Sequence, residues 1–62
     1  MNTTFRDIWT GLTADEKRVL AKKVKTSVPY LSQIAYGHRG ASRGMIRRLV
    51  GARKDLSAEM FL

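Results

Sequence analysis

The side chains best equipped for chemistry in this 62-residue sequence are its cations. The sequence has twelve Lys and Arg residues and five Asp and Glu residues, which gives a formal net charge of +7. The acidic residues are scattered, there is no cysteine, and His38 is the single histidine. A nucleophile with its base, or a set of metal ligands, cannot be assembled from these residues. We therefore expect no enzyme, no metal and no cofactor. We expect a polyanion as the partner of the basic surface, with a basic domain that has no such ligand as the alternative.

One short segment, Ser27 to Gln33, carries groups that can distinguish base pairs. The amide of Gln33 can form two hydrogen bonds with adenine, and the apolar Val28 and Pro29 can contact the methyl group of thymine. Ser27 and Ser32 add hydroxyl groups to the segment. This set suits the major groove of DNA if a helix presents it outward. The alternatives are a purely capping role for Ser27 and a solvated position for Gln33.

Helices must position this segment, because apolar residues recur at helical spacing and no stretch alternates for long. A first helix is predicted from about Thr4 to Thr10, with Thr3 or Thr4 as its cap and Gly11 as the residue that breaks its end. Its apolar face is formed by Phe5, Ile8, Trp9 and Leu12.

The second helix is predicted to begin at Thr13, which can form a capping box with Glu16, and to stop near Val24 or Lys25. The third helix is short. Ser27 is its predicted N-cap, Pro29 falls in its first turn, and Gly37 ends it in the left-handed conformation.

After a loop from His38 to Ala41, Ser42 is predicted to cap a fourth helix from about Arg43 to Ala52. A last short turn is predicted from Ala58 to Phe61, with Ser57 as its cap. The expected fold is therefore all-α, with four to five helices in a single domain over residues 1–62. No apolar run approaches the roughly 20 residues needed to span a bilayer. No secretory signal is visible, so we expect the cytoplasm and no membrane partner.

The second and third helices, with the tight turn between them, are predicted to form a helix-turn-helix over about residues 17–36. Ala21 is small where the two helices should cross. Apolar residues occupy the positions that must lock the pair at a fixed angle, namely Leu20, Val24, Leu31 and Ile34.

The stretch from Ser27 to Arg39, with Leu20-Ala21 before it and Ala41-Ser42 after it, resembles the Cro/CI-type, lambda-repressor-like helix-turn-helix family. It is especially similar to the short Cro-like and YdaS-like proteins of phages and prophages. The similarity covers about Leu12 to Leu62. The sequence departs from the family pattern in the turn, where Lys25 replaces the usual glycine and Thr26 replaces an apolar residue. A lysine there implies strain from a positive φ, or a different turn.

The resemblance implies that the third helix lies in the major groove of double-stranded DNA. Base contacts are then expected from Ser27, Val28, Pro29, Ser32 and Gln33. Lys17, Arg39 and Arg43 match positions from which the family contacts phosphates, and Lys25 can add another contact. Tyr30 is expected to pack on the second helix with its hydroxyl toward a phosphate, and Tyr36 lies either at the core edge or on the DNA backbone.

These expectations amount to a sequence-specific transcription regulator, a Cro-like repressor that occludes an operator in a bacterial cell and takes no small-molecule ligand. Because base contacts are few and each is worth about 1–3 kcal/mol, we expect a homodimer, formed either in free solution or only on DNA, with half-sites about 34 Å apart on a palindromic site. The interface candidates, which could equally cover the core, are Leu56, Met60, Phe61 and Leu62. The alternatives are a protein-interaction module, such as an antitoxin or antirepressor partner, and a non-specific nucleic-acid binder.

Overall fold

The computed structural model describes residues 3–61, and every regular element in that range is helical. The elements are α1 (Phe5–Gly11), α2 (Ala14–Lys23), α3 (Val28–Ala35), α4 (Arg43–Ala52) and the 3-10 helix η1 (Ala58–Phe61). The predicted all-α domain is thus confirmed over the described range, which contains no strand, and each helix begins and ends within about one residue of its predicted bounds. No helix in that range is long and apolar enough to cross a membrane.

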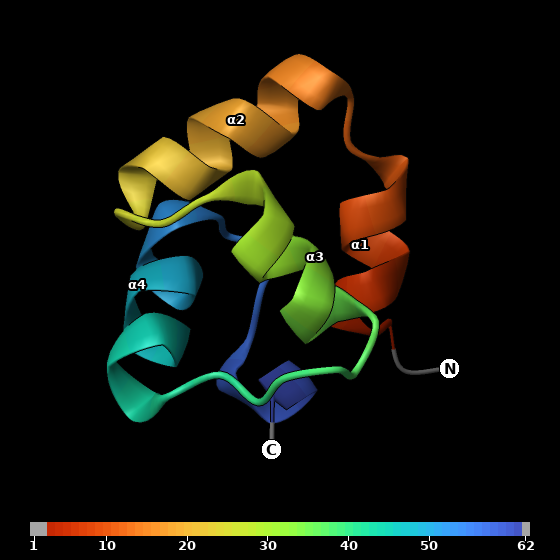
Figure 1. Cartoon of the computed structure of the whole chain (residues 1–62). Helices are drawn as coiled ribbons and strands as arrows, with labels where there is room; N and C mark the ends of the chain where they lie inside the picture. Colours follow the sequence, from red (N-terminus) through yellow and green to blue (C-terminus); the bar gives the residue numbers. More distant parts are fainter. Residues whose placement is uncertain (1–2, 62) are drawn as a thin grey trace.

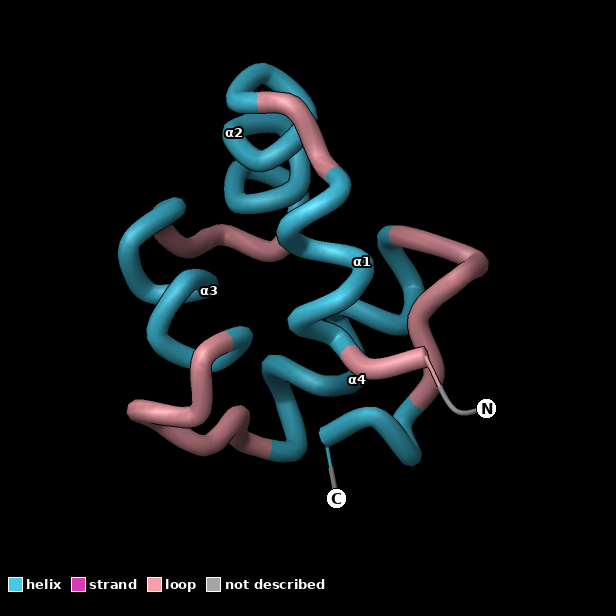
Figure 2. The backbone as a smooth tube through the Cα atoms, turned by 90° about the vertical axis from the view of Figure 1, so that its right-hand side faces the viewer, coloured by secondary structure: helices cyan, strands magenta, loops and turns pink. Residues whose placement is uncertain are grey.

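The helix α3 lies at the front of the molecule in Figure 1, with α1 to its right, α2 above it and α4 to its left. It packs against both α1 and α2, while α4 packs against α2 and η1. Seen from the side, α3 and the loop that follows it lie along one edge of the molecule (Figure 2). This placement leaves one face of α3 uncovered by the other helices.

Side-chain caps fix where the helices begin. The predicted capping box at the start of α2 is present, with Thr13 Oγ1 accepting from Glu16 N (3.1 Å) and Glu16 Oε1 accepting from Thr13 N (2.9 Å). A second box, which the sequence analysis did not identify, joins Thr4 and Asp7 at the start of α1. Hydrogen bonds from the backbone and then the side chains of the two threonines hold the pKa values of Asp7 and Glu16 below their ordinary values. Both carboxylates are therefore committed to helix ends.

Helix α1 ends at Gly11, the residue predicted to break its end. Gly11 does not have a positive φ. The chain leaves the helix through Leu12 (φ −81°, ψ 145°) and Thr13 (φ −71°, ψ 166°), which are both extended. These two extended residues are the whole connection between α1 and α2, so the chain passes from one helix to the other without a left-handed residue.

The core draws one apolar face from each α-helix. Trp9, Val24, Leu31 and Leu49 are its largest fully buried side chains. The indole Nε1–H of Trp9 donates to Ser32 Oγ at 3.1 Å, and within residues 3–61 no buried side-chain polar atom lacks a hydrogen-bond partner. Every buried side-chain polar atom in the described range therefore has a hydrogen-bond partner, as is usual in protein interiors.

The C-terminal segment closes the bottom of this core. Leu56 is buried, and Met60 and Phe61 are half-buried against the core. The Phe61 ring lies 5.0 Å from the Phe5 ring, centroid to centroid. The proposal of Leu56 as a dimer contact is therefore wrong, because its side chain is used inside the monomer. Leu62, the last interface candidate, lies outside the described residues.

Candidate nucleic-acid interface

The turn between α2 and α3 is a Schellman motif with a lysine in the left-handed position. Thr26 N donates to Ala21 O (2.9 Å), Lys25 N donates to Lys22 O (3.2 Å), and Lys25 has φ +59°. These are the bonds that satisfy the last carbonyl groups of a helix in this motif. The turn therefore keeps the usual geometry, and the lysine bears the strain of a positive φ.

The end of α3 repeats the same motif with a glycine. His38 N donates to Gln33 O (2.9 Å), Gly37 N donates to Ile34 O (3.2 Å), and Gly37 has φ +80°. The prediction for Gly37 is confirmed. Since both turns have the same hydrogen bonds, the lysine at position 25 is not required by the fold.

The start of α3 is fixed as predicted. Ser27 Oγ accepts from Tyr30 N at 3.3 Å, and Pro29 lies in the first turn, where no intrahelical donor is lost. Leu31, Ile34 and Ala35 form the buried face. The opposite side presents the exposed Ser27, Pro29 and Gln33, while Val28 is half-buried beside them.

Ser32 does not lie on the outward side, as the sequence analysis expected. It is half-buried, and its hydroxyl oxygen accepts the hydrogen bond from Trp9. The reason is that α3 packs against α1 as well as α2, so its inner face is wider than one row of apolar residues. The outward set of predicted base-contacting residues is thereby reduced to Ser27, Pro29 and Gln33, with Val28 at its edge.

A surface hollow lies where the start of α2 meets the start of α3. Lys17, Val28 and Pro29 line it together with Ala14 and Arg18. Lys17 is half-buried, and its Nζ lies 5.2 Å from the centre of the Trp9 ring. The structure thus brings one predicted phosphate contact next to two predicted base contacts that lie 11 and 12 residues further along the chain.

Two arginine–tyrosine pairs lie along α3, one at its first turn and one at its end. The Arg39 guanidinium carbon lies 5.4 Å from the centre of the Tyr30 ring, and that of Arg6 lies 5.0 Å from the centre of the Tyr36 ring. Tyr30 is half-buried and packs against the core, whereas Tyr36 is 43% exposed. The sequence analysis did not single out Arg6, because nothing local links it to a residue 30 positions away. The one available signal was a cation in the first turn of a helix, where the helix dipole disfavours it.

Most of the cations around α3 form no ion pair with an acidic residue within residues 3–61. The described residues contain two ion pairs, Arg18 with Asp15 and Arg53 with Asp55. The second is bidentate, with both distances 2.9 Å; it lowers the pKa of Asp55 and raises that of Arg53. Within residues 3–61, no ion pair involves the predicted phosphate contacts Lys17, Lys25, Arg39 and Arg43. The last three of these are exposed.

The described residues hold no group of three or more His, Asp or Glu side chains that could bind a metal ion. Comparisons of the chain with protein-family models, with curated proteins and with solved structures found no match.

Proposed function

We propose that this chain is a sequence-specific DNA-binding regulator of the lambda-repressor-like class, with α3 as the helix that enters the major groove. The observation that carries the proposal is the set of charged side chains around α3. The outward α3 residues Ser27, Pro29 and Gln33 lie among cations of which Lys17, Lys25, Arg39 and Arg43 form no ion pair within residues 3–61. Four acidic side chains are instead used in helix caps or in ion pairs with Arg18 and Arg53.

The dimensions of α3 support this reading. An α-helix with its side chains is about 10–12 Å across, close to the roughly 12 Å width of the major groove. The exposed surface offers one amide, one hydroxyl and apolar groups, so it favours adenine edges and thymine methyls. Lys17 and Lys25 at the start of α3, and Arg39 and Arg43 beyond its end, can then hold the phosphates on either side.

Two copies on a palindromic operator remain part of the proposal, since one such surface contacts few base pairs. The C-terminal segment serves the monomer core, which leaves Met60 and Phe61 only half-exposed. We therefore propose that the two copies assemble on the DNA, and that they act as a repressor by occluding the operator.

Selection of binding sites from random duplex DNA tests the proposal. The expected result is a short, two-fold symmetric consensus rich in A·T pairs. Gln33→Ala should relax the preference at one or two positions in each half-site and leave the others unchanged. Equal affinity for selected and random duplexes would contradict sequence-specific binding. Affinity that hardly changes with salt would favour a protein-interaction module instead.

A further inference from the structure

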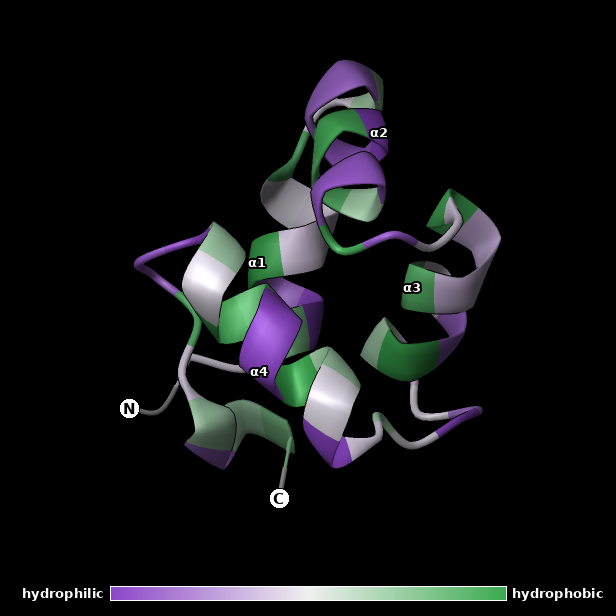
Figure 3. Cartoon of the chain, turned by 90° about the vertical axis from the view of Figure 1, so that its left-hand side faces the viewer, coloured by the Kyte–Doolittle hydropathy of each residue, from purple (hydrophilic) through white to green (hydrophobic). Residues whose placement is uncertain are grey.

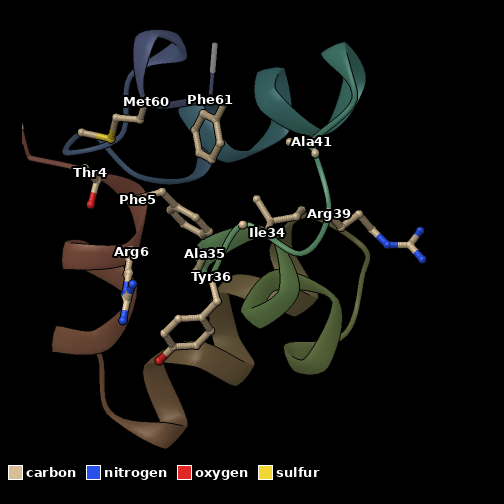
Figure 4. A pocket seen from close by; sticks show the side chains of 12 residues that line it. Thr4, Phe5, Arg6, Ile34, Ala35, Tyr36, Arg39, Ala41, Met60 and Phe61 are labelled. Atoms are coloured by element: carbon tan, nitrogen blue, oxygen red, sulfur yellow. The ribbon is translucent and has the colours of Figure 1, made fainter.

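Tyr36 is an aromatic side chain at the end of α3 that stays exposed to solvent. It is the C-cap residue of that helix and is 43% exposed. The Arg6 side chain of α1 faces its ring (Figure 4), with 5.0 Å between the guanidinium carbon and the ring centre. Such a stack holds a guanidinium in place while its N–H groups remain available at the edge.

Arg6 stands where the local structure disfavours it. It is the second residue of α1, close to the positive end of the helix dipole, where an acidic residue would stabilise the helix. The neighbouring acid is committed elsewhere, because the Asp7 carboxylate accepts from Thr4 N at 3.1 Å. No ion pair within residues 3–61 involves Arg6. Apart from the contact with Tyr36, the Arg6 charge makes only the smallest of the contributions that lower the pKa of Asp7.

The position of Arg6 completes the set of cations around α3. The beginning of α1 lies beside the end of α3 (Figures 1 and 4). Lys17 and Lys25 lie at the beginning of α3, the Arg39 guanidinium faces Tyr30 in its first turn, and Arg6 faces Tyr36 at its end. A cation at each end of a helix in the major groove can reach the phosphate strand on its own side.

We infer that Arg6, from outside the helix-turn-helix, contacts a phosphate of the bound DNA, and that the Tyr36 ring is the positioning residue that holds it there. The inference rests on the proposed function. It assigns the ring of Tyr36, and not its hydroxyl, to the interface. It also makes α1 part of the DNA-binding surface.

The test measures duplex affinity against salt for four variants of the full chain. Arg6→Gln should weaken binding to every sequence by roughly tenfold, as expected for the loss of one charged hydrogen bond, and should reduce the slope of log K against log salt by about one. Tyr36→Phe should bind like the unmodified chain, because it keeps the ring. Tyr36→Leu should bind more weakly, and Arg6→Gln with Tyr36→Leu should bind no more weakly than Arg6→Gln alone.

Lys54→Gln is the matched control for the loss of one positive charge. Lys54 is exposed and belongs to the hydrophilic loop after α4, on the side of the molecule opposite α3 (Figure 3). An Arg6→Gln effect no larger than that of Lys54→Gln would overturn the phosphate contact. A Tyr36→Phe variant as weak as Tyr36→Leu would overturn the role of the ring. Thermal midpoints of the variants, expected to stay close to that of the unmodified chain, separate binding from unfolding. Failure of the unmodified chain to bind any duplex would instead overturn the proposed function, and this inference with it.

Discussion

Lys25 and Gly37 occupy the same place at the ends of two successive helices. Both close a Schellman motif, with φ +59° and φ +80°, but only the glycine is free of a Cβ penalty. A left-handed conformation costs an ordinary residue about 1–2 kcal/mol. A strained residue that the fold does not need points to a use for its side chain. Under the proposed function that use is a phosphate contact from the turn.

Lys25→Gly is expected to separate stability from binding. It should raise the free energy of unfolding by about 0.5–1 kcal/mol, because relief of strain exceeds the added entropy of the unfolded chain. It should also weaken binding to all duplexes and lower the salt slope by about one. Urea unfolding and DNA titrations measure the two effects. Lys25→Ala is the control, since it removes the charge and keeps the strain; a Lys25→Gly variant that was no more stable than Lys25→Ala would contradict the strain argument.

Ser32 supports the packing of α3 against α1 and does not belong to the outward surface of α3. Ser32→Ala should lower the free energy of unfolding by about 1–3 kcal/mol, because the buried Trp9 Nε1–H loses its acceptor. Site selection with the variant should return the same consensus as the unmodified chain. A changed base preference without a loss of stability would show that the hydroxyl contacts DNA instead.

At the level of elements, short helices are stabilised mainly at their ends and by the core. The seven residues of α1 and the ten of α2 each begin with a capping box. In each box the threonine takes one free backbone N–H and the acid takes another. The 3-10 helix η1 adds no buried residue of its own, yet Phe61 covers Phe5 and so ties the end of the chain to α1.

The capping boxes predict a loss of stability in acid. The pKa values of Asp7 and Glu16 are lowered in the folded chain, so the two carboxylates contribute stability that is fully present above their unfolded pKa values. That contribution disappears as the pH falls below about 4 and passes through the folded values. Thermal midpoints between pH 6 and pH 2 measure it. The double variant Asp7→Asn with Glu16→Gln should lose less stability over this range, and an equal loss would assign the acid sensitivity to other groups.

At the level of the whole molecule, the charges around α3 are mostly positive and mostly unpaired. Arg18, which lines the hollow at the start of α3, pairs with Asp15, and Arg53, in the loop on the side opposite α3 (Figure 3), pairs with Asp55. Lys17, Lys25, Arg39 and Arg43 form no ion pair within the described range. A group of unpaired cations around one helix favours a polyanion as its partner.

The number of cations around α3 sets the salt dependence that the proposed DNA binding should show. If Lys17, Lys25, Arg39, Arg43 and Arg6 each neutralise one phosphate, log K should fall against log salt with a slope of about −4 to −5 for one copy. Two copies on a palindromic duplex should give roughly twice that slope. Titrations on half-site and full-site duplexes, combined with sedimentation with and without DNA, measure both slope and stoichiometry. A single copy on a full palindromic site would contradict assembly on the DNA.

The sequence by itself determined the helices, their starts and most of the core. These features depend on neighbours within about four residues, as in the Thr13–Glu16 box and the apolar spacing of Met45 and Leu49. The left-handed end at Gly37 is equally local. The capping role of Asp7 is equally local, so it could have been predicted from the sequence as well.

Only the tertiary structure decided which faces are covered and which distant residues meet. Ser32 points inward because α3 packs on α1, and Leu56 is internal because the chain returns beneath the core. The Arg6–Tyr36 pair joins α1 to the end of α3 across 30 residues of sequence. Helical period fixes the angle between side chains on one helix, but burial depends on how many neighbours that helix has. For α3, a helix of eight residues that packs against both α1 and α2, the packing decides which side chains stay exposed.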